Sequence, residues 1–120
     1  MPKRTLELRI GDAAAALDRF EDAWNLAAAG REPSPAAVLS FAGLPQLIAA
    51  LSPARWQLLG RLRARGPLTV LALARELGRD YKNVHTDVAR LLELGLIGRG
   101  ADGRVQVPWD AVRAELRLEP

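Results

Sequence analysis

Apolar residues recur along the chain at the spacings of regular secondary structure. In residues 6–10, leucine and isoleucine alternate with charged residues, which predicts a short strand with one apolar face. In residues 13–27, apolar side chains recur every three or four positions, which predicts an amphipathic helix that ends at Gly30. A proline-containing loop follows, and then a second short strand at 38–41 and a brief helix at 45–51 are expected.

The middle of the chain predicts three helices with ordinary start and stop signals. They occupy 52–66, 69–78 and 80–95, and each begins at a serine, threonine or aspartate and ends at a glycine. In the third helix the apolar residues that share one side are expected to be buried: Tyr81, Val84, Val88, Leu91 and Leu92. The tryptophans lie on apolar stripes, where they are expected to fill the core or an interface: Trp24, Trp56 and Trp109.

Residues 96–107 have the pattern of a β-hairpin. Two short strands, 96–99 and 104–107, flank a Gly-Ala-Asp-Gly stretch, and Asp-Gly favours a tight turn. Beyond the hairpin we expect a short helical turn from Pro108 and a last strand at 114–118. Three helices followed by a hairpin are typical of a winged helix. The sequence therefore predicts an α+β, mainly helical winged helix-turn-helix with added N- and C-terminal strands.

This fold divides the chain into three regions. Residues 1–51 are expected to form an N-terminal strand-helix region for dimerisation or partner binding, 52–107 the DNA-binding domain, and 108–120 a C-terminal helical turn and strand. A lone short strand leaves its edge unpaired and its apolar face uncovered, so we expect a symmetric homodimer with two recognition helices about 34 Å apart. The expected dimer interface comprises Leu6, Leu8, Ile10, Leu17, Phe20, Trp24, Leu116 and Leu118.

Basic residues are concentrated in the predicted DNA-binding domain. The chain has a formal net charge of +3, and residues 52–107 carry ten basic and five acidic residues, a net charge of +5. Residues 1–51 carry five basic and six acidic residues, a net charge of −1. This asymmetry indicates that the second half of the chain meets a polyanion.

The composition argues against several classes of chemistry. Because the chain has no cysteine, it cannot form a disulfide, a thiolate metal site or a thiol nucleophile. His85 is the only histidine and no phosphate-cradling glycine loop is present, so we expect no enzymatic activity, no metal and no cofactor. No run of about 18 apolar residues indicates a membrane span, and the N-terminus lacks a signal-peptide core, so a cytoplasmic location is expected.

The buried side of the third helix determines which of its residues face outward. Asparagine can form two hydrogen bonds with adenine, and lysine favours guanine or phosphate. Helix N-termini and the hairpin add further contacts to the DNA backbone. The expected DNA-binding residues are Thr69, Arg79, Lys82, Asn83, His85, Thr86, Arg90, Arg99 and Arg104. Arg61, Arg63 and Arg65 are equally consistent with a phosphate-binding stripe and with a solvated helix end.

Two sets of motifs resemble known families. Segments 71–79, 80–88 and 91–97, the last containing Leu-Glu-Leu-Gly-Leu-Ile, resemble MarR-like winged-helix regulators. Gly-Arg-Asp-Tyr-Lys-Asn-Val-His at 78–85 is more particular. Together with the N-terminal strand, the Phe-Glu-Asp-Ala-Trp helix and Val-Pro-Trp-Asp at 107–110, it is similar to the TumA-like antitoxins over nearly the whole chain.

The resemblance implies a sequence-specific regulator of double-stranded DNA. It implies a repressor that acts on its own operon, with a small toxin as a protein partner. The alternative from another class is a winged-helix adaptor that neutralises or scaffolds a protein partner without binding DNA. RNA binding is a third possibility, which the wing and the small number of exposed aromatic residues make less favourable.

Overall fold

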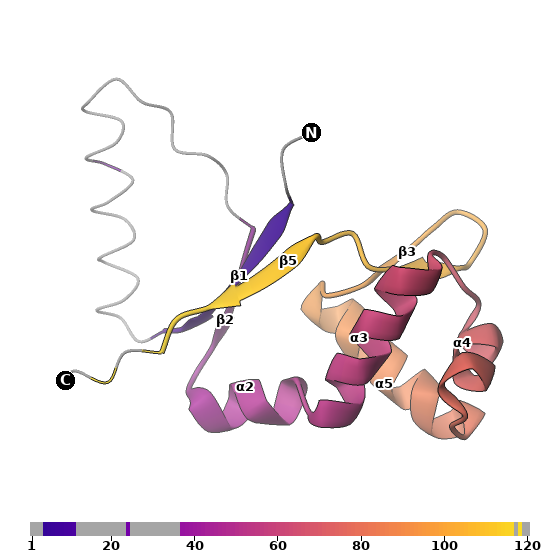
Figure 1. Cartoon of the computed structure of the whole chain (residues 1–120). Helices are drawn as coiled ribbons and strands as arrows, with labels where there is room; N and C mark the ends of the chain where they lie inside the picture. Colours follow the sequence, from indigo (N-terminus) through magenta and orange to yellow (C-terminus); the bar gives the residue numbers. More distant parts are fainter. Residues whose placement is uncertain (1–3, 12–23, 25–36, 117, 119–120) are drawn as a thin grey trace.

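The computed structural model describes residues 4–11, 24, 37–116 and 118 (Figure 1). Within them the protein is α+β, with helices beside a small parallel sheet and a short hairpin. In chain order the elements of this part are β1 (Thr5–Ile10), β2 (Ala37–Phe41), α2 (Leu44–Ala50), α3 (Pro53–Arg65), α4 (Val70–Leu77), α5 (Tyr81–Leu94), β3 (Gly98–Arg99), β4 (Val105–Gln106) and β5 (Ala111–Ala114).

The helices α3, α4 and α5 begin and end where the sequence predicts. The side chains of Ser52, Thr69 and Asp80 each accept a hydrogen bond from the backbone N–H three residues further on, at 3.3, 3.1 and 3.4 Å. These bonds satisfy N–H groups that the start of a helix leaves without a backbone partner. At the other ends, Gly78 and Gly95 adopt the left-handed conformation, with φ of 62° and 80°. Glycine closes α4 and α5 there at little steric cost.

Three strands form one parallel sheet in the order β2–β1–β5. β1 is the central strand, because Leu6 pairs with Ala37 of β2 on one side and with Val112 of β5 on the other. The prediction that the N-terminal strand lacks a partner within the chain is therefore wrong. Its partners are strands that follow later in the sequence, and the local apolar pattern does not encode which strands pair.

The C-terminal segment also differs from its predicted structure. The last strand covers Ala111–Ala114 instead of 114–118, and no helical turn begins at Pro108. The backbone N–H of Asp110 donates to the carbonyl of Arg4 at 2.8 Å, which draws this segment alongside β1 in an extended conformation. Pairing with β1 therefore sets the start of β5.

The apolar face of β1 is buried within the chain. Leu6 and Leu8 are 4% and 5% exposed and belong to the same hydrophobic core as the helices, while Ile10 is half-buried. Because the surface of Leu6 and Leu8 is already removed from water, these residues cannot supply the predicted dimer interface. Three other members of the predicted interface are exposed: Trp24, Leu116 and Leu118. Leu17 and Phe20 lie outside the described residues.

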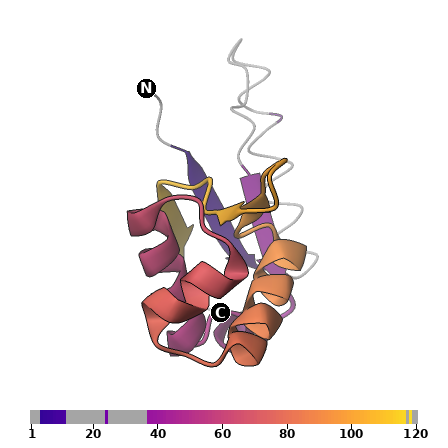
Figure 2. The same cartoon turned by 90° about the vertical axis from the view of Figure 1, so that its right-hand side faces the viewer.

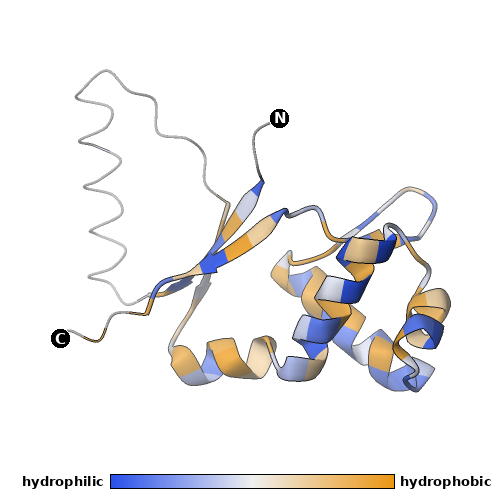
Figure 3. Ribbon diagram, viewed as in Figure 1, coloured by the Kyte–Doolittle hydropathy of each residue, from blue (hydrophilic) through white to orange (hydrophobic). Residues whose placement is uncertain are grey.

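One core joins α3, α4 and α5 to the hairpin. Along these helices hydrophobic residues are interspersed with hydrophilic ones (Figure 3). Two residues of α3 and α5 that the sequence placed on apolar stripes are outside this core: Tyr81 is 48% exposed and Trp56 is 54% exposed. Each lies in the first turn of its helix, ahead of the part of the stripe that packs inward. The fully buried side chains of the core are Leu58, Leu62, Leu73, Val84, Val88, Leu91, Leu96 and Val105.

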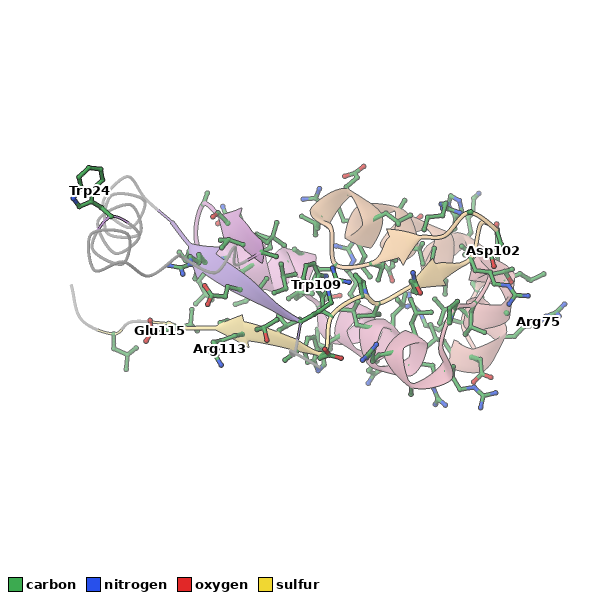
Figure 4. All side chains as sticks on the ribbon, turned by 90° about the horizontal axis from the view of Figure 1, so that it is seen from above. Trp24, Arg75, Asp102, Trp109, Arg113 and Glu115 are labelled. Carbon is green, nitrogen blue, oxygen red and sulfur yellow. The ribbon has the colours of Figure 1, made fainter. Side chains whose placement is uncertain are left out.

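Contacts near the start of β5 attach the sheet to the helices. Asp110 forms an ion pair with Arg63 of α3 and accepts a hydrogen bond from the backbone N–H of Arg4 at 2.8 Å. The indole N–H of Trp109 donates to the carbonyl of Gly95 at 3.0 Å, and the guanidinium of Arg4 lies 5.1 Å from the Trp109 ring centroid. Trp109 thus lies between the helical part and the sheet (Figure 4). Among the described residues, no helix has the length and apolar character needed to cross a bilayer.

Candidate nucleic-acid interface

The helices α4 and α5 meet at a short turn, residues 78–80, and α4 also contacts α3 (Figure 2). The backbone N–H of Arg79 donates to the carbonyl of Ala74 at 3.1 Å, which keeps this turn tight. On α5, Val84 and Val88 are fully buried. Burial of this side fixes the rotation of α5 about its axis, so the residues on its other side face solvent.

The predicted outward residues of α5 are all exposed: Lys82, Asn83, His85, Thr86 and Arg90. Among the described residues, the side chains of Lys82 and Asn83 have no hydrogen-bond or ion-pair partner, so their polar groups are available to a ligand. The hydroxyl of Thr86 donates to the carbonyl of Lys82 at 3.0 Å. The rings of His85 and Tyr81 lie 5.9 Å apart between centroids, and Arg90 pairs with Glu93 at 3.0 Å on the surface.

The hairpin is held against the start of α4. Leu68 and Val105 exchange two backbone hydrogen bonds, at 3.1 and 2.9 Å, so the segment before α4 runs beside β4. Arg99 and Arg104 are exposed on the hairpin, as expected. A guanidinium N–H of Arg99 donates to the carbonyl of Gly103 at 3.1 Å, while Arg104 lies 3.8 Å from an Asp102 carboxylate oxygen. Both contacts are exposed, and an exposed ion pair such as that of Arg104 costs little to exchange for one with another anion.

Two other expected contact residues have structural partners. The hydroxyl of Thr69 is exposed but accepts the capping hydrogen bond of α4, from the N–H of Ala72 at 3.1 Å. The guanidinium of Arg79 pairs with Asp87 of α5 at 2.9 Å. Sequence reasoning missed Asp87, because a single acidic residue on a helix carries no local sign of its distant partners.

The arginines at the end of α3 are paired with carboxylates. Arg61 and Arg65 lie 3.8 and 3.0 Å from Glu76 of α4, and Arg63 pairs with Asp110. They are therefore not a row of unpaired cations along α3. Arg75 of α4, which sequence reasoning did not single out, is exposed and has no ion-pair partner among the described residues. It points outward at the same end of the molecule as Asp102 of the hairpin (Figure 4).

The described residues contain no group of three or more histidine, aspartate or glutamate side chains placed to hold a metal ion. The chemistry of this surface is thus hydrogen bonding and charge. It presents a lysine and an asparagine on α5 that have no partner within the described part of the chain, together with Arg75 on α4 and two arginines on the hairpin.

Comparison with known proteins gives one family. The HVO_A0114 family model matches residues 50–114, a range that runs from the last residue of α2 through α3, α4, α5 and the hairpin to the end of β5. The name of this family does not denote an activity. No curated protein matches the chain.

Proposed function

This chain belongs to the HVO_A0114 family, and we propose that it is a winged helix-turn-helix repressor that binds a specific site in double-stranded DNA. The observation that carries the proposal is the exposed N-terminal side of α5, where Lys82 and Asn83 have no partner among the described residues. The major groove is about 12 Å wide and admits one helix, whose N-terminal residues reach the base edges. In this proposal α5 is the recognition helix, with Asn83 reading adenine and Lys82 reaching guanine or phosphate.

The positions of the remaining basic residues support the same orientation. Arg99 and Arg104 lie on the hairpin, which in this proposal is the wing beside the recognition helix. Arg75 adds an exposed cation on α4. Cations that neutralise phosphates release counterions from DNA, and this release supplies binding energy that is independent of sequence. The wing and α4 would then supply affinity and α5 specificity.

We further propose that two copies bind one operator as a homodimer. Residues 41–60 contain a single charged residue, Arg55, and that residue is paired with Asp87. Leu44, Ile48 and Trp56 in this segment are exposed. An isologous contact brings the same surface together twice, and an uncharged apolar surface meets itself without repulsion. This segment replaces Leu6 and Leu8 as the proposed contact between copies.

The resemblance to TumA-like antitoxins supports a narrower role. In this role the protein represses its own operon, acts in the cytoplasm and neutralises a small toxin. Co-expression with the product of the neighbouring gene, followed by affinity purification of the complex, tests the toxin partner separately from DNA binding.

Fluorescence anisotropy tests the DNA-binding proposal. The full-length protein is titrated onto duplex from its own upstream region and onto a scrambled duplex, each over a series of salt concentrations. We expect tighter binding to the native duplex and a steep loss of affinity as salt rises.

Matched variants locate the interface. Lys82→Ala is expected to weaken binding to both duplexes, whereas Asn83→Ala is expected to reduce the preference for the native duplex by roughly 1–3 kcal/mol. Arg113→Ala is the control, since Arg113 is an exposed cation on the sheet, well away from Arg75 and the hairpin (Figure 4). Absence of binding to both duplexes would refute the proposal and favour the adaptor function. Equal effects of Lys82→Ala and Arg113→Ala would refute the choice of α5.

A further inference from the structure

The carboxylate of Asp87, in the middle of α5, pairs with two arginines. One oxygen accepts from Nε of Arg55 at 3.1 Å, and the other accepts from a terminal nitrogen of Arg79 at 2.9 Å. All three side chains are largely buried: Asp87 is 14% exposed, Arg55 18% and Arg79 30%. The pairs are therefore shielded from water and salt more than surface ion pairs are.

These three residues connect four segments of the chain. Asp87 belongs to α5, Arg55 to the first turn of α3, and Arg79 to the turn between α4 and α5. Arg55 also donates to the carbonyls of Ala49 and Ala50 at the end of α2, at 3.5 and 3.3 Å. The carboxylate thus holds α5 at a fixed rotation and angle relative to the elements that precede it.

The guanidinium of Arg79 is turned inward. One terminal nitrogen is bound to Asp87, and the other is buried and has no hydrogen-bond partner among the described residues. A phosphate contact requires N–H groups that the DNA backbone can reach. One of these two nitrogens is buried, and the other already donates to the Asp87 carboxylate. The sequence-based role of Arg79 as a DNA contact therefore conflicts with the position of its side chain.

We propose that Arg79 and Asp87 are positioning residues for DNA recognition. Together with Arg55 they hold α5 so that Lys82 and Asn83 face the groove, and Arg79 makes no phosphate contact. This inference rests on the proposed function, because it assigns the pair a role in binding DNA. It predicts that loss of the pair reduces the preference for the native duplex over the scrambled one more than it reduces the salt-dependent part of the affinity for DNA. The reason is that base contacts depend on the angle of the helix more sharply than phosphate contacts do.

The test compares Arg79→Gln with Lys82→Gln. Both changes remove one positive charge, but Lys82 is exposed and has no partner among the described residues. Affinity for the native and the scrambled duplex is measured over a salt series. The slope of log affinity against log salt falls by about 0.9 for each phosphate contact that is lost. We expect Arg79→Gln to leave the slope unchanged and to reduce the preference for the native duplex by about tenfold.

Lys82→Gln is expected to lower the slope and to weaken binding to both duplexes.

A double-mutant cycle gives the second readout. If Arg79 acts through Asp87, Arg79→Gln combined with Asp87→Asn loses no more preference than Asp87→Asn alone. Circular dichroism and thermal unfolding establish that each variant is folded, and Arg79→Gln retains the pair of Asp87 with Arg55.

Two different results would overturn the inference. If Arg79→Gln lowers the salt slope by about 0.9 and weakens both duplexes equally, Arg79 is a phosphate contact and the proposed function still holds. If the parent protein binds neither duplex, the proposed function fails and the positioning role fails with it.

Discussion

Replacing Leu8 with alanine separates a core role for β1 from an interface role. Leu8 is 5% exposed, and its neighbours in the sheet are Leu39 of β2 and Ala114 of β5. Truncation of a buried leucine removes its transfer free energy and leaves a cavity, at a cost of about 2–5 kcal/mol. Because β1 is hydrogen-bonded on both edges, its backbone cannot move far to fill the cavity. We therefore expect the free energy of unfolding to fall by about 3 kcal/mol.

Val38 provides the matched control. It lies on the neighbouring strand, on the opposite face of the sheet, and is 42% exposed. Val38→Ala is expected to change the free energy of unfolding by about 0.5 kcal/mol. Urea unfolding followed by tryptophan fluorescence, at two protein concentrations, measures both variants. A loss below about 1 kcal/mol for Leu8→Ala, or a loss that depends on protein concentration, would contradict the placement of Leu8 in the core of one chain.

Two further predictions concern glycines and the proposed dimer. Gly78→Ala should lower the free energy of unfolding by about 1 kcal/mol, because φ is +62° at Gly78. Gly60→Ala should raise the free energy of unfolding by about 1 kcal/mol, because Gly60 lies inside α3 and no atom lies near the added Cβ. Thermal unfolding measures both variants, and changes of the same sign would contradict these backbone conformations. Ile48→Glu should convert the proposed dimer to a monomer in analytical ultracentrifugation. Leu71 is an exposed leucine on α4, and the control variant Leu71→Glu should remain a dimer. A parent protein that sediments as a monomer would contradict the dimer proposal.

The helices were predictable because their boundary signals are local. Ser52, Thr69 and Asp80 cap helices through bonds that span three residues, and Gly78 and Gly95 end helices by their own conformation. The exposed side of α5 was predictable for a similar reason, since the spacing of its apolar residues determines which side is buried.

The sheet and the ion pairs were not predictable from local pattern. Val112 pairs with Leu6 across almost the whole chain, and a period-two pattern specifies a strand without naming its neighbours. Arg55 and Asp87 are 32 positions apart, so no spacing rule links them. Arg79 thus looked like a free cation in the sequence, although it is committed to Asp87 in the fold.

The placement of β1 between β2 and β5 also constrains the order in which the chain folds. During synthesis, β1 is made before the other described elements, yet its second partner, at Ala111–Ala114, is made after every helix of the described part. The caps and short-range contacts of α3, α4 and α5 allow those helices to associate early, while closing the sheet requires a contact across most of the chain. A nascent chain therefore carries Leu6 and Leu8 without their final neighbour until β5 has been made, which is the period when this part of the protein is most open to aggregation or to capture by a chaperone.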